Sequence, residues 1–383
     1  MKKSFSNAIL EAERCVSCGL CLPNCPTYRK TLSEADSPRG RLNLMRGAMK
    51  GEIPINKRFI EHIDLCLDCR SCEKVCPNHV QYDAVLRAMR APIEEAKGRS
   101  LLKKASLGLV SRPGWVEKMG RLYLESGLRL PGKYSNLDAM MQRGLPAFPK
   151  KSVYEAKGEK NGEVGLFLGC IARLTDTHAL NAAIHVLNSL GYTVHVPQDQ
   201  TCCGALHVRY GEDAVPLMEK NRQAFSEIDT IVSTSSACTA ELSREFQGRV
   251  QDISGFLENA EGWERVEISP FEGKIAVHDP CSLRNVLKKE AMPYRILEKI
   301  PGAIVEALPA NGQCCGSAGS YFLTEPEMAN ALLDDKMEVI GKSEAKIIAT
   351  SNVGCAMSLR GRGARVAHPV VIIARQMGYQ CSI

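Results

Sequence analysis

Eight cysteines near the N-terminus form two runs with the same spacing, CxxCxxCxxxCP. The members of these runs are Cys15, Cys18, Cys21, Cys25 and Pro26, then Cys66, Cys69, Cys72, Cys76 and Pro77. The first three thiolates of such a run can bind three irons of one cubane cluster, while the fourth ligates the cluster of the other run. Because each run completes the other, the pair predicts two 4Fe–4S clusters.

The position of the fourth cysteine assigns the ligands crosswise. We expect the ligand sets Cys15, Cys18, Cys21 and Cys76, and Cys66, Cys69, Cys72 and Cys25. A zinc ribbon is the alternative, because CxxC pairs also bind zinc. Zinc needs only four ligands in two pairs, however, and gives no reason for the longer run to occur twice, so the sequence favours the clusters.

Further along the chain, the remaining cysteines form a second repeat. Its two sets are Cys170, Cys202, Cys203 and Cys238, and Cys281, Cys314, Cys315 and Cys355. In each set a glycine follows the vicinal pair, and the two sets are offset by about 111 residues, which indicates an internal duplication. Vicinal cysteines can also be small buried residues, a strained disulfide or redox thiols. Their recurrence in both halves favours metal or thiol chemistry.

Short apolar runs precede these cysteines and alternate with segments of helical length. The expected strands are 163–168, 192–196, 230–233, 274–278, 303–308 and 346–350, and the expected helices include 179–190 and 327–340. This alternation is typical of βαβ units with parallel sheets. Each cysteine then follows the carboxyl end of a strand, the edge of an open α/β sheet where ligands gather. Three loops carrying four cysteines could therefore converge on one cluster in each half.

The composition is that of an ordinary globular protein with an unusual cysteine content. The chain has 383 residues, 44% hydrophobic and 24% charged, so several domains are expected. Its 17 cysteines are strictly clustered, which indicates metal ligation in a reducing compartment rather than a disulfide framework. No secretory signal follows Met1 and no run of about 18 apolar residues occurs, so we expect a cytoplasmic protein, at most peripheral on the inner face of the membrane.

The net charge of +6 does not indicate a nucleic-acid-binding protein. Each four-thiolate cluster carries about −2, so two clusters lower the total to about +2 and four lower it to about −2. The lysines and arginines are scattered, without a basic stripe or interleaved aromatic residues.

Taken together, these motifs resemble the iron–sulfur subunit of bacterial glycolate oxidase. The C-terminal halves are similar to the cysteine-rich CCG domains of heterodisulfide reductase and lactate-utilisation proteins. The supporting motifs, besides the cysteine sets, are Ser37–Leu42 (SPRGRL), His278–Cys281 (HDPC), Cys314–Gly319 (CCGSAG) and Ser351–Cys355 (SNVGC). The resemblance implies an α+β multidomain chain: a helical two-cluster ferredoxin domain (1–100), a helical connector (101–160), and two duplicated α/β CCG domains (161–270 and 271–383).

What the resemblance implies about function is an electron conduit. The chain would relay electrons from an FAD-containing 2-hydroxy-acid oxidase subunit, acting on glycolate or lactate, towards quinone or a related membrane acceptor. No GxGxxG opens a helix after a strand here, which agrees with a flavin held by a partner. The iron–sulfur subunit of anaerobic glycerol-3-phosphate dehydrogenase has a similar layout and remains an alternative.

One departure bears on a further alternative, a heterodisulfide-reductase-like thiol/disulfide subunit. In that family the last cysteine begins a CxxC, which supplies a fifth thiol to a disulfide-cleaving cluster. Here Glu241 and Ser358 stand at those positions, so direct disulfide reduction is not expected, while a plain four-thiolate cluster stays compatible with each half. The second half matches the family more fully, and a third cluster at Cys281, Cys314, Cys315 and Cys355 is favoured over a fourth at Cys170, Cys202, Cys203 and Cys238. No catalytic residue is expected in this chain.

Overall fold

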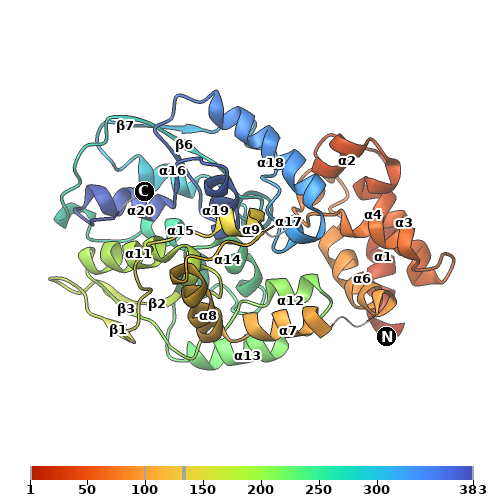
Figure 1. Cartoon of the computed structure of the whole chain (residues 1–383), viewed down its shortest axis with the longest axis horizontal. Coiled ribbons are helices and arrows are strands. Elements are labelled where there is room, and N and C mark those ends of the chain that lie inside the picture. The colour runs from red at the N-terminus through yellow and green to blue at the C-terminus, as the bar shows by residue number, and fades with distance from the viewer. Residues whose placement is uncertain (1, 99–100, 132–134, 382–383) are drawn as a thin grey trace. The chain divides into compact units, whose positions relative to one another are not determined.

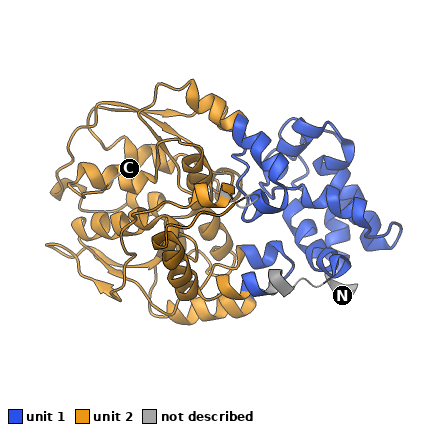
Figure 2. Ribbon diagram, viewed as in Figure 1, with its two compact units in different colours: residues 1–107, 206–214, 312–334 blue, residues 108–205, 215–311, 335–383 orange. Residues whose placement is uncertain are grey.

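The computed structural model describes residues 2–98, 101–131 and 135–381, which form two compact units (Figure 2). Unit 1 consists of residues 1–107, 206–214 and 312–334; unit 2 consists of residues 108–205, 215–311 and 335–383. Two inserts from the C-terminal region thus belong to the N-terminal unit. The first insert begins three residues after the vicinal pair Cys202–Cys203, whereas the second contains the vicinal pair Cys314–Cys315.

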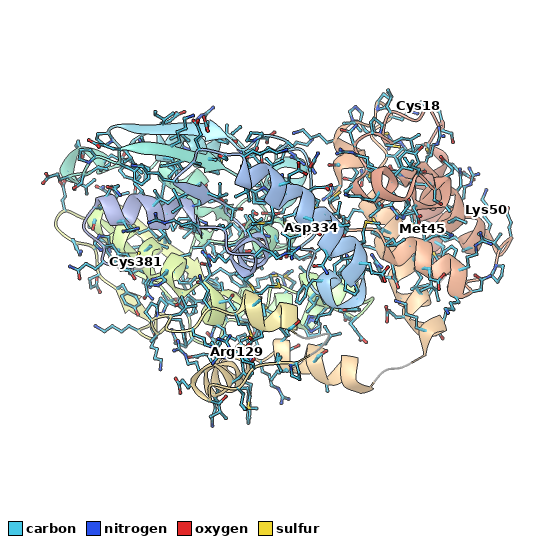
Figure 3. All side chains as sticks on the ribbon, turned by 45° about the horizontal axis from the view of Figure 1, so that its top comes forward. Cys18, Met45, Lys50, Arg129, Asp334 and Cys381 are labelled. Atoms are coloured by element: carbon cyan, nitrogen blue, oxygen red, sulfur yellow. The ribbon has the colours of Figure 1, made fainter. Side chains whose placement is uncertain are left out.

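Unit 1 is helical, as the sequence predicts for the ferredoxin region (Figure 1). Its elements are α1 (Lys2–Glu13), α2 (Pro26–Thr31), η1 (Glu34–Asp36), α3 (Pro38–Lys50), α4 (Lys57–Asp64), α5 (Ser71–Lys74), α6 (Tyr82–Lys97) and α17 (Tyr321–Thr324). The α3 helix begins with Pro38, and the Ser37 hydroxyl accepts a hydrogen bond from the Gly40 N–H (2.9 Å), which caps the helix. Met45 of α3 (Figure 3) is fully buried with Val85 and Met89 of α6, and this apolar core supports the cysteine loops.

Unit 2 contains two sheets that repeat one topology. The first has the order β1-β3-β2-β4-β5, with β1 (Val153–Tyr154), β2 (Gly162–Phe167), β3 (Tyr192–His195), β4 (Ile231–Ser233) and β5 (Val250–Asp252). The second has the order β7-β6-β8-β9, with β6 (Gly273–Val277), β7 (Ala303–Ala307), β8 (Ile347–Ala349) and β9 (Val366–Ala367). Apart from antiparallel β1, all described pairings are parallel, which confirms the predicted fold class.

The helices of unit 2 pack against both sheets, and together they enclose one shared apolar core. These helices are α8 (Pro113–Glu125), α9 (Ser135–Met140), α10 (Ala172–Thr175), α11 (Thr177–Ser189), α13 (Val215–Ala224), α14 (Ser236–Leu242), α15 (Ile253–Glu258), η3 (Trp263–Arg265), η4 (Ser282–Leu287), α16 (Met292–Leu297), α19 (Val353–Gly361) and α20 (Pro369–Gln376). The remaining helices α7 (Leu101–Val110), α12 (Ala205–Arg209) and α18 (Pro326–Gly341) cross from one unit to the other along the chain. In the core, α11 packs against α20, and buried residues of both sheets, such as Leu166 and Val277, belong to one cluster. The domain boundaries drawn from the sequence remain a prediction.

Candidate iron–sulfur sites

The first cavity of unit 1 brings together the cysteines of the first predicted set. Cys15, Cys18 and Cys21 line it from the loop between α1 and α2, and Cys76 lines it from the second run. The cavity holds about 480 Å³ of space, part of it open to solvent, and Cys18 is its exposed cysteine (Figure 3). The predicted set therefore supplies four thiols, the donors that a cubane cluster requires.

The second cavity brings together the other predicted set. Cys66, Cys69 and Cys72 line it together with Cys25, and it holds about 340 Å³. Cys72, Pro38 and Tyr82 line both cavities, so the two sites adjoin each other. This arrangement is the one that crosswise ligation needs, although ligation itself remains a prediction.

The two cysteine loops share an unusual backbone conformation. Ser17 and Gly19 in the first run, and Asp68 and Arg70 in the second, all have positive φ, between 55° and 85°. These residues stand at matching positions, two and four residues after the first cysteine of each run. For a residue other than glycine, this left-handed conformation costs about 1–2 kcal/mol. Strained backbone of this kind is often found at functional sites. Here the strained residues lie in the loops that surround the two cavities, which supports the binding of an iron–sulfur cluster in each.

The SPRGRL segment places one arginine at each cavity. Arg39 lines the first cavity and donates to the backbone oxygen of Ser17 (2.8 Å), which fixes the first loop. Arg41 lines the second cavity, is 1% exposed, and donates to the Thr27 hydroxyl (3.0 Å). Gly40 stands between the two arginines. A larger residue does not fit there, because a Cβ would overlap the backbone oxygen of Glu34.

The electrostatics of Arg41 suit a negatively charged occupant. Its guanidinium lies 3.9 Å from the Cys25 sulfur and 3.8 Å from the Asp36 carboxylate. Burial lowers the pKa of Arg41, but the charges of Cys66, Tyr82, Cys25 and Asp36 outweigh burial and raise it, so the cation is retained. In contrast, burial raises the pKa of Cys72, and that of Cys21 to about 11, so these thiols ionise only when a metal takes the place of the proton.

In unit 2, the first CCG set is gathered at one edge of the first sheet. Cys170 follows β2, the vicinal pair Cys202 and Cys203 follows β3, and Cys238 lies in α14 after β4. The Cys202 and Cys170 sulfurs are 3.5 Å apart, and Cys203 is hydrogen-bonded to both Cys202 and Cys238. Four sulfurs thus form a contiguous group after three strands, as the strand pattern predicts, although Cys238 lies in the first turn of α14 rather than in a loop.

Mutual contact and burial favour the protonated form of three of these thiols, Cys202, Cys203 and Cys238, because they raise the pKa of each. The contact with Cys170 raises the pKa of Cys202 well above its ordinary value, and the contact with Cys203 does the same for Cys238. A bound metal would replace these protons, because a coordinating thiol is deprotonated. The donor set is chemically that of a four-thiolate cluster, and a cluster at this set remains a prediction.

The second CCG set is divided between the units. Cys281 and Cys355 belong to unit 2, and the Asn352 amide donates to the buried Cys355 sulfur (3.4 Å). Cys314 and Cys315 belong to unit 1, where Cys314 packs in one apolar cluster with Leu67 and Cys69 of the second ferredoxin run. The ligand set Cys281, Cys314, Cys315 and Cys355 therefore stays a prediction.

The sequence assigned no role to Arg39 or Arg41, although it singled out their motif. The feature of the sequence that could have identified Arg39 and Arg41 is the position of two positively charged residues between the two cysteine runs. Among the helices of the described residues, none is both long enough and apolar enough to cross a membrane.

Comparison with known proteins identifies the two cysteine-rich regions as domains of known families. A family model for a 4Fe–4S dicluster domain matches residues 11–80, and a model for a cysteine-rich domain matches residues 164–243 and 275–360. The chain is 30% identical to the probable glycolate oxidase iron–sulfur subunit of Bacillus subtilis, over 94% of this chain and 91% of the relative. It is 28% identical to the glycolate oxidase iron–sulfur subunit of Escherichia coli, over 97% and 95%, respectively. A third relative is a subunit of the fumarate reductase (CoM/CoB) of Methanothermobacter marburgensis, with 26% identity over 90% of this chain and 67% of the relative. With two cysteine-lined cavities, a duplicated cysteine-rich region and two glycolate oxidase relatives matched over 91% and 95% of their length, the chain belongs to the family of glycolate oxidase iron–sulfur subunits.

Proposed function

We propose that this chain is the electron-transferring subunit of a flavin-dependent 2-hydroxy-acid oxidase complex. It would receive electrons from an FAD-containing partner that oxidises glycolate or lactate, and would deliver them to quinone or a related acceptor. The observation that carries the proposal is the pair of adjoining cavities, each lined by one full predicted set of four cysteines. When bound, 4Fe–4S clusters supply one-electron transfer, at potentials set by their surroundings.

The residues around the cavities support a relay rather than catalysis. Arg41 holds a buried positive charge at the second cavity, and the Tyr82 hydroxyl donates to the Cys66 sulfur (3.6 Å). Charges and hydrogen bonds of this kind at the sulfurs tune a cluster's potential. Cys314 shares an apolar cluster with Cys69 within unit 1, which supports an exit route from the second cavity towards Cys314.

The substrate class rests on the relatives' names. Two are glycolate oxidase subunits, and the lactate utilization protein A of Geobacillus thermodenitrificans is 28% identical over 55% of this chain. The alternative, a thiol/disulfide redox subunit, is favoured by the relative named for CoM and CoB. Glu241 and Ser358, in place of the fifth cysteines, weigh against it.

Substrate-driven reduction of the purified complex tests the proposal. The tagged chain, isolated anaerobically from its source cell, should retain flavin-containing subunits. Glycolate or lactate should then bleach the cluster absorbance, and a quinone analogue should restore it. The matched control is a complex carrying Cys66→Ser, in which bleaching should be reduced. Reduction by glycerol 3-phosphate alone, or by a dithiol without any flavoprotein, would contradict the proposal and favour the corresponding alternative.

A further inference from the structure

The two halves of unit 2 share a hydrogen-bonded clamp that involves no cysteine. The Gln200 amide accepts from the Leu168 N–H (2.7 Å) and donates to the Leu166 carbonyl (3.1 Å). In the second half, the Asn311 amide accepts from the Asp279 N–H (2.8 Å) and donates to the Val277 carbonyl (2.8 Å). Every partner in the second half stands 111 positions after its counterpart. The clamp therefore belongs to the duplicated unit.

An arginine completes the clamp in each half. Arg173 donates to the backbone carbonyl of Gln200 (3.3 Å), and Arg284 donates to that of Asn311. These arginines stand three residues after Cys170 and Cys281, again 111 positions apart. Each arginine thus ties the helical turn after the first cysteine to the segment that leads into the vicinal pair. In the first half, where both loops belong to unit 2, this contact fixes the spacing between two of the loops that carry the predicted ligands.

Arg173 is also a buried charge. Its side chain is 3% exposed, and it also donates to the Gly169 carbonyl (3.1 Å) and lies over the Phe148 ring. Among the described residues it forms no ion pair, because Glu117 pairs with Arg121 instead (2.9 Å). Burial lowers the pKa of Arg173 to about 10, and the charges of Glu117 and Cys170 act in the opposite direction.

An uncompensated buried cation is unfavourable unless negative charge lies beside it. With four thiols, the nearby charge of Glu117, which pairs with Arg121, only partly offsets the Arg173 cation, whereas a four-thiolate cluster carries about −2. The buried cation and the predicted occupant of the Cys170 set therefore complement each other in charge.

We infer that Arg173 and Arg284 are matched positioning residues, which tie the turn after the first cysteine to the segment before the vicinal pair and place a permanent positive charge three residues after the first cysteine of each CCG set. The inference rests on the proposed iron–sulfur function, since the charge acts on a bound cluster. A fixed positive charge favours the more negative, reduced state, so both arginines raise the reduction potential of the cluster beside them.

Arg173→Gln and Arg173→Lys test the inference in the full chain, purified anaerobically. The readouts are iron and acid-labile sulfide per chain, and reduction potentials followed by EPR. The signal of the Cys170 set is assigned by its loss in Cys238→Ser. Arg222→Gln is the matched control, since Arg222 lies on α13, is 43% exposed and pairs with Glu219.

The expected result is that Arg173→Gln loses the iron of the Cys170 set or shifts its potential to a more negative value. Arg173→Lys keeps the charge but not the fork-shaped guanidinium, so its potential should lie closer to the wild-type value. The ferredoxin signals of unit 1 should be unchanged in both variants, which shows that unit 1 has folded and that the effect is confined to unit 2. Arg284→Gln should have the same effect on the signal that Cys355→Ser removes.

Unchanged iron content and potential in Arg173→Gln would overturn the inference. A wild-type chain whose Cys170 set binds no iron would also overturn it, and would leave electron transfer through the ferredoxin cavities intact. Conversely, a shifted potential in a complex that glycolate and lactate fail to reduce would support the inference and refute the proposed function.

Discussion

Arg360 donates to one carboxylate oxygen of Asp176 from both of its terminal nitrogens, at 3.1 Å each. The two residues are 184 positions apart, and their side chains are 10% and 3% exposed, respectively. Asp176 stands between α10 and α11 of the first half, whereas Arg360 lies in α19 of the second. The pair therefore ties the two duplicated halves together inside unit 2.

Removing one partner of this pair should destabilise unit 2 strongly. Arg360→Met leaves a buried carboxylate without its cation, so the free energy of unfolding should fall by about 3–5 kcal/mol. The control is Arg222→Met, which breaks the exposed pair with Glu219 and should cost about 0–1 kcal/mol. Urea unfolding measures both, and equal effects of the two substitutions would contradict this role of the Asp176–Arg360 pair.

Crosswise ligation predicts which pairs of cysteine substitutions share one cluster. Cys18→Ser with Cys76→Ser removes two ligands of the first cavity, so iron should fall by about four per chain, as in either single variant. Cys18→Ser with Cys25→Ser removes one ligand from each cavity, so iron should fall by about eight. Iron analysis of the anaerobic variants measures the difference. The opposite order of losses would show that each run ligates its own cluster.

Gly316, which follows the vicinal pair in the second half, should not tolerate a side chain. Its φ is +76°, and a Cβ there would overlap the backbone oxygen of Ala329 in the same unit. Gly316→Ala should cost about 1–2 kcal/mol for the left-handed backbone and about 1–3 kcal/mol more for the overlap. Gly363→Ala is the control, because Gly363 has φ +84° with nothing within 4 Å of the added Cβ. Thermal unfolding measures the two variants. An equal decrease of the Tm in both would show that the predicted overlap with Ala329 contributes nothing.

Asp252 should make the stability of unit 2 depend on pH. Burial raises the pKa of this carboxyl from 3.8 to about 7, while one of its oxygens caps α15 by accepting from the Ser254 N–H (2.9 Å). Between these pH values the native state binds more protons than the unfolded state, so stability falls as the pH rises from about 4 to about 7. Asp252→Asn keeps the capping oxygen but cannot ionise. It should match the wild type near the acid end and exceed it by about 2–4 kcal/mol at pH 7 and above.

Denaturant unfolding across this pH range tests the role of Asp252. Asp252→Ala is the control, because it removes both the charge and the cap and should lose about 1 kcal/mol relative to Asp252→Asn at every pH. A wild-type profile parallel to that of Asp252→Asn would contradict the raised pKa.

The strands and cysteine loops could be predicted from sequence because their signals are local. Short apolar runs predicted β2, β3, β4, β6, β7 and β8, each close to its observed bounds. The strands β1 and β9 have two residues each, too few for a periodic pattern. Cys314 and Cys315 belong to a different compact unit from Cys281. This assignment depends on packing between segments that are distant in the sequence, so no local sequence pattern could predict it. The roles of Arg173 and Gln200 could have been predicted from the sequence. When the two halves are aligned with the offset between Cys170 and Cys281, Arg173 matches Arg284 and Gln200 matches Asn311.

The most direct test of the electron-conduit account is the iron and acid-labile sulfide content of the anaerobically purified chain, together with zinc analysis. The account predicts about 12 to 16 irons per chain, with equal sulfide: about eight from the two cavities of unit 1 and about four for each CCG set that is filled. Fewer than about eight irons, with zinc in the cysteine sites, would contradict it.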